Sequence, residues 1–151
     1  MKALYKKLNQ EKPFANAVDE ALINVLVAAG HIRDRIDVFL KPYGITSAQY
    51  NVLRILRGVY PNGHPRCDIA KRMIERAPDV TRLIDRLESM KLVERDRSQQ
   101  DRRLSITRIS KTGLELLKRV DVDDELKKEF SKKLNARDAN ALSSILERLY
   151  G

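Results

Sequence analysis

The sequence predicts a mainly α-helical fold with one small β-hairpin, and three observations support it. Apolar residues recur at three- and four-residue steps over most of the chain, as they do on one face of a helix. Between residues 92 and 107 the spacing changes to the alternation of short strands. The length of 151 residues suits one hydrophobic core, so we expect a single domain over residues 1–151.

The N-terminal part contains one long helix. The first dozen residues are polar, and we expect a loose arm or a frayed helix start there. From Ala17 to Leu40 the apolar residues form a helical stripe that is wide for a surface helix. Part of it is therefore expected to bury against a partner subunit, through Leu22, Val25 and Leu26.

A second helix follows a clear break. Pro, Tyr and Gly at residues 42–44 end the first helix, and Thr46 with Gln49 three residues later matches the capping box of the next. This helix is predicted to reach about Val59. The turn-forming residues 60–65 then predict a loop.

Two shorter helices come next, over about Asp68 to Ile74 and Pro78 to Met90. Pro78 suits the first turn of a helix, where its missing N–H costs nothing. In the second of these helices, steps of about 100° per residue bring three apolar residues to within about 60° of Val80. This predicted buried face consists of Val80, Leu83, Ile84 and Leu87.

The hairpin is predicted from strands at residues 92–96 and 104–107, joined by a charged loop from Arg97 to Arg103. Ser110 is a plausible cap for a long helix that follows, in which the acidic run at 121–125 is a candidate bend. Asn135 is predicted to cap a final helix. Apolar residues of these last helices that we expect in a subunit interface are Phe130, Leu142, Ile145, Leu146 and Leu149.

A short helix, a tight turn, a second helix and a hairpin make the plan of a winged helix-turn-helix, in which the second helix enters the DNA major groove. We assign it to residues 45–110, with helical dimerisation regions at 15–41 and 111–150. On the reading helix Arg82 lies opposite the apolar face, Asp79 and Arg86 lie on its flanks, and Thr81 lies near the boundary. Guanidinium groups there can fork to guanine or to phosphate.

The alternative for this face is an ordinary solvated helix in which Arg82 and Arg86 pair with Asp79, Asp85 or Glu88. The charge distribution favours DNA contact. The chain carries +9, which suits a polyanion, either nucleic acid or an anionic membrane, and residues 66–111 hold 13 basic against 8 acidic residues. An arginine at a hairpin tip can also reach into a minor groove. The arginines of the hairpin are Arg95, Arg97, Arg102 and Arg103.

Several sequence motifs resemble one family. They are VTRLIDRLE on the reading helix, LVER before the hairpin tip, DRR at the tip, SKTG opening the next helix, and LKPYGITSAQYNVLRIL upstream. Over about residues 32–118 the chain resembles the MarR family of multiple-antibiotic-resistance-type regulators. The resemblance implies a homodimer, built from the first and last helices, that reads a pseudo-palindromic operator in double-stranded DNA.

The resemblance also implies roles for particular residues. Asp101 would orient an arginine of the hairpin tip, and Arg103 or its neighbour Arg102 would enter the minor groove. The contacts of the reading helix would come from Thr81, Arg82 and Arg86.

Two positions depart from the family pattern. Many relatives have glycine where this chain has Lys91, so either a non-glycine residue has a positive φ there or the turn differs. The turn before the reading helix is Ile74-Glu75-Arg76-Ala77 instead of the frequent glycine, apolar, serine pattern. Its geometry and cap are therefore less defined by the resemblance, and Arg76 is a candidate for a further phosphate contact.

Other candidate sites have weaker support. Cys67, the single cysteine, could sense oxidants, but a small residue at the start of the DNA-binding domain is the better interpretation. His31 and His64 are too few for a metal cluster, and the acidic run at 121–125 lacks the spacing of a calcium loop. We expect no metal and no cofactor. No signal peptide or membrane span is apparent, so a cytoplasmic protein is expected.

The leading hypothesis is thus a homodimeric repressor or activator whose DNA affinity changes when a small molecule binds between the dimerisation helices and the winged domain. The alternative is an architectural or RNA-binding basic module without sequence preference. An enzyme is disfavoured because the sequence contains no phosphate loop, dinucleotide fingerprint, nucleophile elbow or metal motif.

Overall fold

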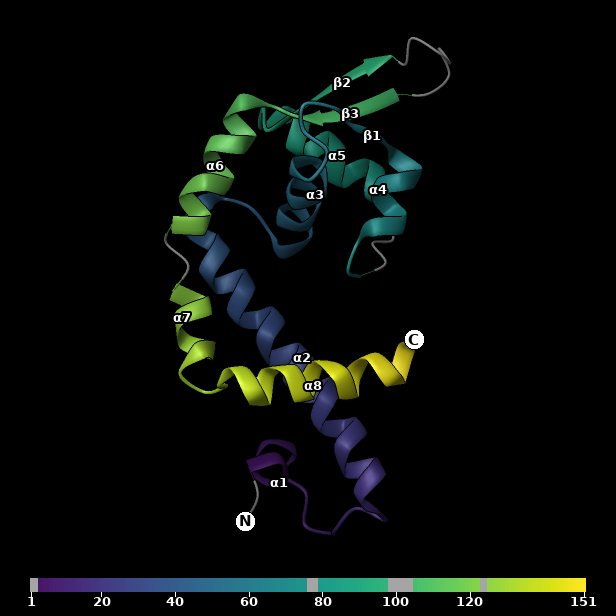
Figure 1. Ribbon diagram of the computed structural model, residues 1–151, viewed down its shortest axis with the longest axis vertical. Coiled ribbons are helices and arrows are strands. Elements are labelled where there is room, and N and C mark those ends of the chain that lie inside the picture. Colours follow the sequence, from purple (N-terminus) through teal and green to yellow (C-terminus); the bar gives the residue numbers. More distant parts are fainter. Residues whose placement is uncertain (1–2, 76–78, 98–104, 123–124) are drawn as a thin grey trace. The chain divides into compact units, whose positions relative to one another are not determined.

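The computed structural model describes residues 3–75, 79–97, 105–122 and 125–151 (Figure 1). The chain divides into two compact units, Met1–Val38 and Phe39–Gly151, which are described separately. The first unit contains helix α1, Ala3–Leu8, and most of helix α2, Ala17–Leu40. The predicted first helix has the bounds of α2 and is confirmed.

Of the loose arm or frayed helix start expected at the N-terminus, the loose arm is wrong for residues 3–8, which form the separate helix α1. Leu4 is buried, and the rings of Tyr5 and Phe14 meet edge to face with their centroids 5.3 Å apart. The backbone N–H of Phe14 also donates a hydrogen bond to the Tyr5 hydroxyl at 3.3 Å. Three apolar side chains therefore stabilise a short helix in a segment whose overall composition is polar.

The second unit starts with a helix break and a capped helix. A 3₁₀ turn, Lys41–Tyr43, ends at Gly44, whose φ of 71° is easily reached only without a Cβ. Helix α3, Ser47–Arg57, then begins with the capping box that the sequence predicts. Thr46 Oγ1 accepts from the N–H of Gln49, and Gln49 Oε1 accepts from the N–H of Thr46. The buried face of α3 consists of Gln49, Val52, Leu53 and Leu56.

The sheet has three antiparallel strands in the order β1-β3-β2, namely β1, His64–Pro65, β2, Val93–Arg97, and β3, Ser105–Ile109. The predicted hairpin is confirmed, with strand ends shifted by one or two residues. Strand β1 was not predicted, because its two residues lie among turn-forming ones. It pairs with β3 through His64 opposite Thr107.

Helices α4, Arg66–Arg72, and α5, Val80–Ser89, form the helix-turn-helix with α3 packed against both (Figure 1). Helix α5 starts later than predicted because Asp79 is its cap, with its carboxylate accepting from the N–H of Arg82. Pro78, predicted in the first turn, lies outside the described residues. The predicted apolar face is correct, since Val80, Ile84 and Leu87 are buried and Leu83 is half-buried.

Three helices follow the sheet: α6, Lys111–Val122, α7, Glu125–Ser131, and α8, Ala136–Tyr150. The predicted long helix corresponds to α6 and α7, and residues 123–124 of the acidic run, the candidate bend, lie outside the described residues. Asp121 near the end of α6 forms an ion pair with Arg57 at the end of α3, at 2.5 Å. Asn135 caps α8 as predicted. Among the described residues, no helix is long and apolar enough to cross a membrane.

Candidate nucleic-acid interface

Helix α5 presents a polar face to solvent opposite its buried apolar face. Thr81, Arg82 and Arg86 are all exposed, and the side chain of Arg82 is 87% exposed. Asp79, predicted on the same surface, is 45% exposed although it caps the helix. The predicted reading-helix residues therefore lie together on one accessible surface.

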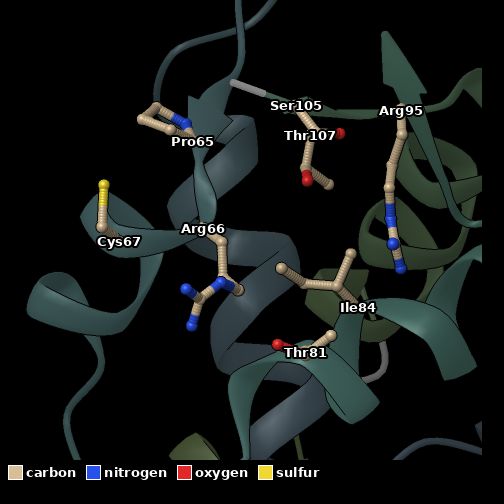
Figure 2. Close-up of a pocket in the computed structure, with 8 residues that line it drawn as sticks. All are labelled: Pro65, Arg66, Cys67, Thr81, Ile84, Arg95, Ser105 and Thr107. Atoms are coloured by element: carbon tan, nitrogen blue, oxygen red, sulfur yellow. The ribbon is translucent and has the colours of Figure 1, made fainter. Parts of the chain in front are cut away.

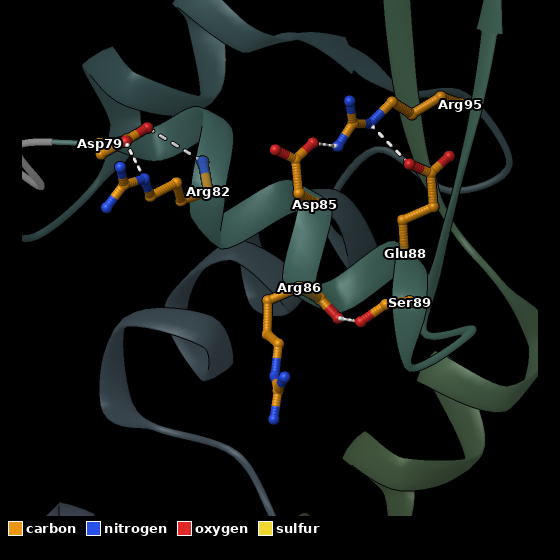
Figure 3. Close-up of polar contacts among 7 residues, drawn as sticks. All are labelled: Asp79, Arg82, Asp85, Arg86, Glu88, Ser89 and Arg95. Carbon is orange, nitrogen blue, oxygen red and sulfur yellow. Dashed lines mark hydrogen bonds and ion pairs between the residues drawn. The ribbon is translucent and has the colours of Figure 1, made fainter.

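The two arginines of this face have different surroundings. Arg82 Nε lies 3.0 Å from Asp79 Oδ2, so this guanidinium already has a carboxylate partner. The side chain of Arg86 extends away from the helix, and it has no hydrogen-bond or ion-pair partner among the described residues (Figure 3). The solvated-helix alternative is thus partly correct for Arg82, while Arg86 retains all its donors for another molecule.

Asp85 and Glu88, the other carboxylates proposed as partners on this helix, bind an arginine of the sheet instead. Arg95 of β2 forms an ion pair and hydrogen bond with Asp85, and its Nε lies 3.3 Å from Glu88 Oε2 (Figure 3). Sequence reasoning counted Arg95 with the basic residues of the hairpin and missed this pairing. The spacing of Asp85 and Glu88 places both on one helical face, but it does not identify Arg95 as their partner.

A pocket of about 420 Å³ lies between the start of α4, helix α5 and the sheet (Figure 2). Its apolar floor includes the buried side chain of Ile84. The guanidinium groups of Arg66 and Arg95 border it on opposite sides, and hydroxyl groups approach from α5 and β3. The lining residues are Pro65, Arg66, Cys67, Thr81, Ile84, Arg95, Ser105 and Thr107.

The tip of the hairpin is only partly described. Arg97 ends β2 and pairs through its backbone with Ser105, and Asp96 forms an ion pair with Arg108 across the two strands. Four predicted DNA contacts lie outside the described residues, as does the side chain of Arg97. They are Arg76, Asp101, Arg102 and Arg103.

Lys91 has a φ of 60°. A non-glycine residue therefore occupies the left-handed conformation at this position, where many relatives have glycine. The N–H of Leu92 donates to the carbonyl of Leu87 at 2.9 Å, and the N–H of Lys91 donates to that of Glu88 at 2.8 Å. This pair of hydrogen bonds is the Schellman motif, which ends α5 and directs the chain into β2.

The apolar residues predicted for subunit contacts are incompletely covered in the single chain. In α2 the exposed fractions are 46% for Leu22 and 67% for Leu26, and Val25 is half-buried. No residue of α8 is buried. In α8, Leu142, Ile145 and Leu149 are 43%, 49% and 57% exposed, and Leu146 is half-buried, as is Phe130 of α7.

Three further candidate residues are Cys67, His31 and His64. Cys67 is exposed, and its thiol donates a weak hydrogen bond to Asp68 Oδ1 at 3.8 Å. Figure 2 shows Cys67 on the opposite side of the labelled group from Arg95. His31 lies in α2 and His64 in β1. Among the described residues, no group of three His, Cys, Asp or Glu side chains could hold a metal ion.

Helix α5 is capped, exposes an arginine face, follows a short helix and precedes a hairpin. These features define a winged helix-turn-helix protein of the class that binds duplex DNA. The model of the MarR family matches residues 45–105. A MarR transcription factor from Planctomyces limnophilus is 30% identical with a TM-score of 0.66, over 91% of this chain and 98% of that chain. The chain therefore belongs to the MarR family, whose members are transcription factors and not enzymes.

Two further solved structures share the fold. The transcriptional repressor CouR, bound to a 23-mer DNA duplex, has a TM-score of 0.79 at 24% identity, over 93% of this chain and 100% of that one. MepR from S. aureus, in complex with DNA, has a TM-score of 0.71 at 22% identity, over 84% and 91% of the two chains. No curated protein sequence matches this chain significantly.

Proposed function

We propose that this protein is a sequence-specific regulator of transcription that binds double-stranded DNA as a homodimer. The observation that carries the proposal is the exposed face of α5, where Thr81, Arg82 and Arg86 project from a helix whose other face is buried. A helix of this kind fits the major groove, and arginine can donate two hydrogen bonds to the O6 and N7 of guanine. CouR and MepR, which share the fold, were solved with DNA.

Arg86 is the best candidate for a base contact because its donors have no partner among the described residues. Arg82 must share its guanidinium with Asp79, so we assign it to a phosphate or to a base at the edge of the site. Arg103, or Arg102 in its place, is proposed to reach the adjacent minor groove, with Asp101 orienting this arginine. Arg97 is proposed as a further DNA contact of the hairpin. Arg76 is proposed to contact a phosphate.

The homodimer is supported by the apolar side chains that the single chain leaves exposed. Leucines and isoleucines recur along one face of α8 at three- and four-residue steps, and α2 exposes Leu22 and Leu26. Burying such faces against a second copy removes apolar surface from water. We assign residues 45–110 to DNA binding and residues 15–41 and 111–150 to dimerisation. A two-fold dimer would read a pseudo-palindromic operator with one reading helix per half-site.

We further propose that a small molecule modulates DNA binding. The sequence led us to expect this molecule between the dimerisation helices and the winged domain. The pocket that supports the proposal lies instead within the winged domain, beside α5, with an apolar floor and two arginines at its edge, and it is large enough for a small organic molecule. A ligand that prefers one arrangement of the reading helices would shift the population of that arrangement. The sign of regulation, repression or activation, follows from where the operator lies relative to a promoter.

The test starts from operators selected by the full-length protein out of random duplexes. Affinity for the selected operator should exceed that for a scrambled duplex by on the order of 10³ at moderate salt. It should also fall steeply with salt, because phosphate contacts release counterions. Comparable binding to operator, scrambled DNA and duplex RNA would instead support the architectural or RNA-binding alternative.

The assignment of the hairpin arginine is tested with Arg103→Ala. We expect weaker operator binding and a salt slope reduced by about 1, as for the loss of one phosphate or groove contact. Arg119→Ala, which removes an exposed arginine of α6, is the matched control for charge. Unchanged affinity and unchanged salt slope for Arg103→Ala would refute the assignment.

A further inference from the structure

We propose that Arg95 is a positioning residue for DNA binding: it fastens strand β2 to helix α5 and so fixes how the hairpin and the reading helix are presented to DNA together. This inference rests on the proposed function. It assigns to Asp85 and Glu88 the role of holding Arg95, although both lie on a helix that is proposed to approach a polyanion.

The geometry of the contact supports this role. Arg95 is the central residue of β2, and its guanidinium reaches Asp85 through one terminal nitrogen and Glu88 through Nε, at 3.3 Å (Figure 3). The Glu88 contact is an ion pair without hydrogen-bond alignment. The side chain of Arg95 is 27% exposed, against 55% for Asp85 and 45% for Glu88, so it is the least solvated member.

The position of β2 makes such a fastening useful. Strand β2 is at the edge of the sheet and pairs with β3, and of the described helices α5 has the most extensive contact with it. A reading helix and a hairpin that contact different grooves bind best when their relative placement is set before binding. Two carboxylates on one face of α5, holding one arginine of β2, supply that restraint at the start of the hairpin.

The alternative is that Arg95 contacts DNA directly, and the two roles predict opposite effects for the same substitution. If Arg95 is a DNA contact, removing its two carboxylate partners frees a cation and lowers repulsion, so affinity rises. If Arg95 is a positioning residue, removing the carboxylates loosens the hairpin, so affinity falls despite the more favourable charge. The sign of the change is therefore diagnostic.

The experiment compares three full-length variants with the wild type on the selected operator. Asp85→Asn with Glu88→Gln, and separately Arg95→Met, which keeps an unbranched apolar stem, should each weaken binding by about tenfold. The variant that combines all three substitutions should lose little more operator affinity than the double variant or Arg95→Met alone, because all three residues act through one contact. Glu94→Gln, which removes an exposed carboxylate from the neighbouring position of β2, is the control and should bind at least as tightly as the wild type.

Hydroxyl-radical footprints show where contacts are lost. At saturating protein, protection by the hairpin should weaken in the variants while protection by the reading helix persists. A uniform loss of protection in variants that remain folded, or tighter binding by Asp85→Asn with Glu88→Gln, would overturn the proposal.

A measurement on the free protein separates this proposal from the proposed function. Amide hydrogen exchange in residues 93–97 should become faster, by about threefold or more, in the three variants but not in Glu94→Gln, because local opening of an edge strand depends on its remaining contacts. Unchanged exchange refutes the fastening role even if the operator is bound. Suppose that exchange is faster in the variants but the wild type binds no DNA sequence preferentially. The attachment of β2 to α5 through Arg95 would then be supported, and the proposed function would be refuted.

Discussion

Asp79 makes two contacts with the same residue, Arg82, through its two carboxylate oxygens. Oδ1 accepts a hydrogen bond from the backbone N–H of Arg82 at 3.0 Å, which caps α5. Oδ2 lies 3.0 Å from Nε of the Arg82 side chain. One acidic residue thus both starts the reading helix and holds an arginine of its exposed face.

Two substitutions of Asp79 separate these contributions. Asp79→Asn keeps a capping oxygen, whereas Asp79→Ala removes it and should lower the free energy of unfolding by about 1 kcal/mol, measured by urea denaturation. Asp79→Asn removes a negative charge beside DNA and frees Arg82. It should therefore raise the affinity for DNA severalfold, by a similar factor for the operator and for a scrambled duplex. Weaker DNA binding by Asp79→Asn would show that the carboxylate orients Arg82 for a specific contact.

Lys91 offers a gain in stability. Its φ of 60° is unfavourable for a side chain with a Cβ, and the Schellman hydrogen bonds at this position suit glycine. Lys91→Gly should therefore raise the free energy of unfolding by about 0.5–1 kcal/mol, with the entropy of the unfolded glycine included. Lys91→Ala, which loses the same charge and keeps a Cβ, should give no such gain. Equal stabilities of the two variants would mean that the conformation at residue 91 carries no strain.

Gly113 is required by a close approach and not by its own conformation. A Cβ at this buried position would collide with the carbonyl oxygen of Leu92 and lie 2.8 Å from Cγ1 of Ile109. Gly113→Ala should thus lower the free energy of unfolding by about 1–3 kcal/mol, although alanine favours helices. Thr112→Ala, at the exposed neighbouring position, should be neutral or slightly stabilising in the same thermal or urea measurement. A stable Gly113→Ala protein would mean that the start of α6 can move away from Leu92 and Ile109.

Features encoded by neighbouring residues were predictable from the sequence. The Thr46 and Gln49 capping box, the Asn135 cap and the spacing of the buried residues of α5 each involve positions at most a few residues apart. Helix α1 and strand β1 were missed because each is short, and its stability depends on contacts that composition does not reveal.

The pairing of Arg95 was missed for a related reason. Its partners lie seven and ten residues earlier, in a different element, so neither helical nor strand spacing connects them. The sequence placed three of the proposed DNA contacts on one exposed face of α5 but could not tell which arginine already has a partner. Arg82 and Arg95 have carboxylate partners, whereas Arg86 has none among the described residues. Only the contacts in the folded chain reveal this difference.

The proposed dimer makes a prediction for α8. Ile145 is 49% exposed in the single chain, and Leu142 and Leu149 lie near it on the same helical face. Ile145→Glu would place a charge in the middle of an apolar interface, so we expect sedimentation to show a monomer, or a dimer that dissociates at least tenfold more readily. Because each half-site alone binds weakly, operator affinity should fall as well.

The matched control is Ser144→Glu, which adds the same charge to an exposed residue of α8 about 100° away from Ile145 and about 160° away from Leu142 around the helix. It should leave both the oligomeric state and the affinity near those of the wild type. The far-ultraviolet circular dichroism of both variants should match the wild type, because neither residue is buried in the single chain. If Ile145→Glu remains a dimer of unchanged affinity, the apolar face of α8 lies outside the subunit interface, and the exposed face of α2 becomes the surface to test through Leu26→Glu.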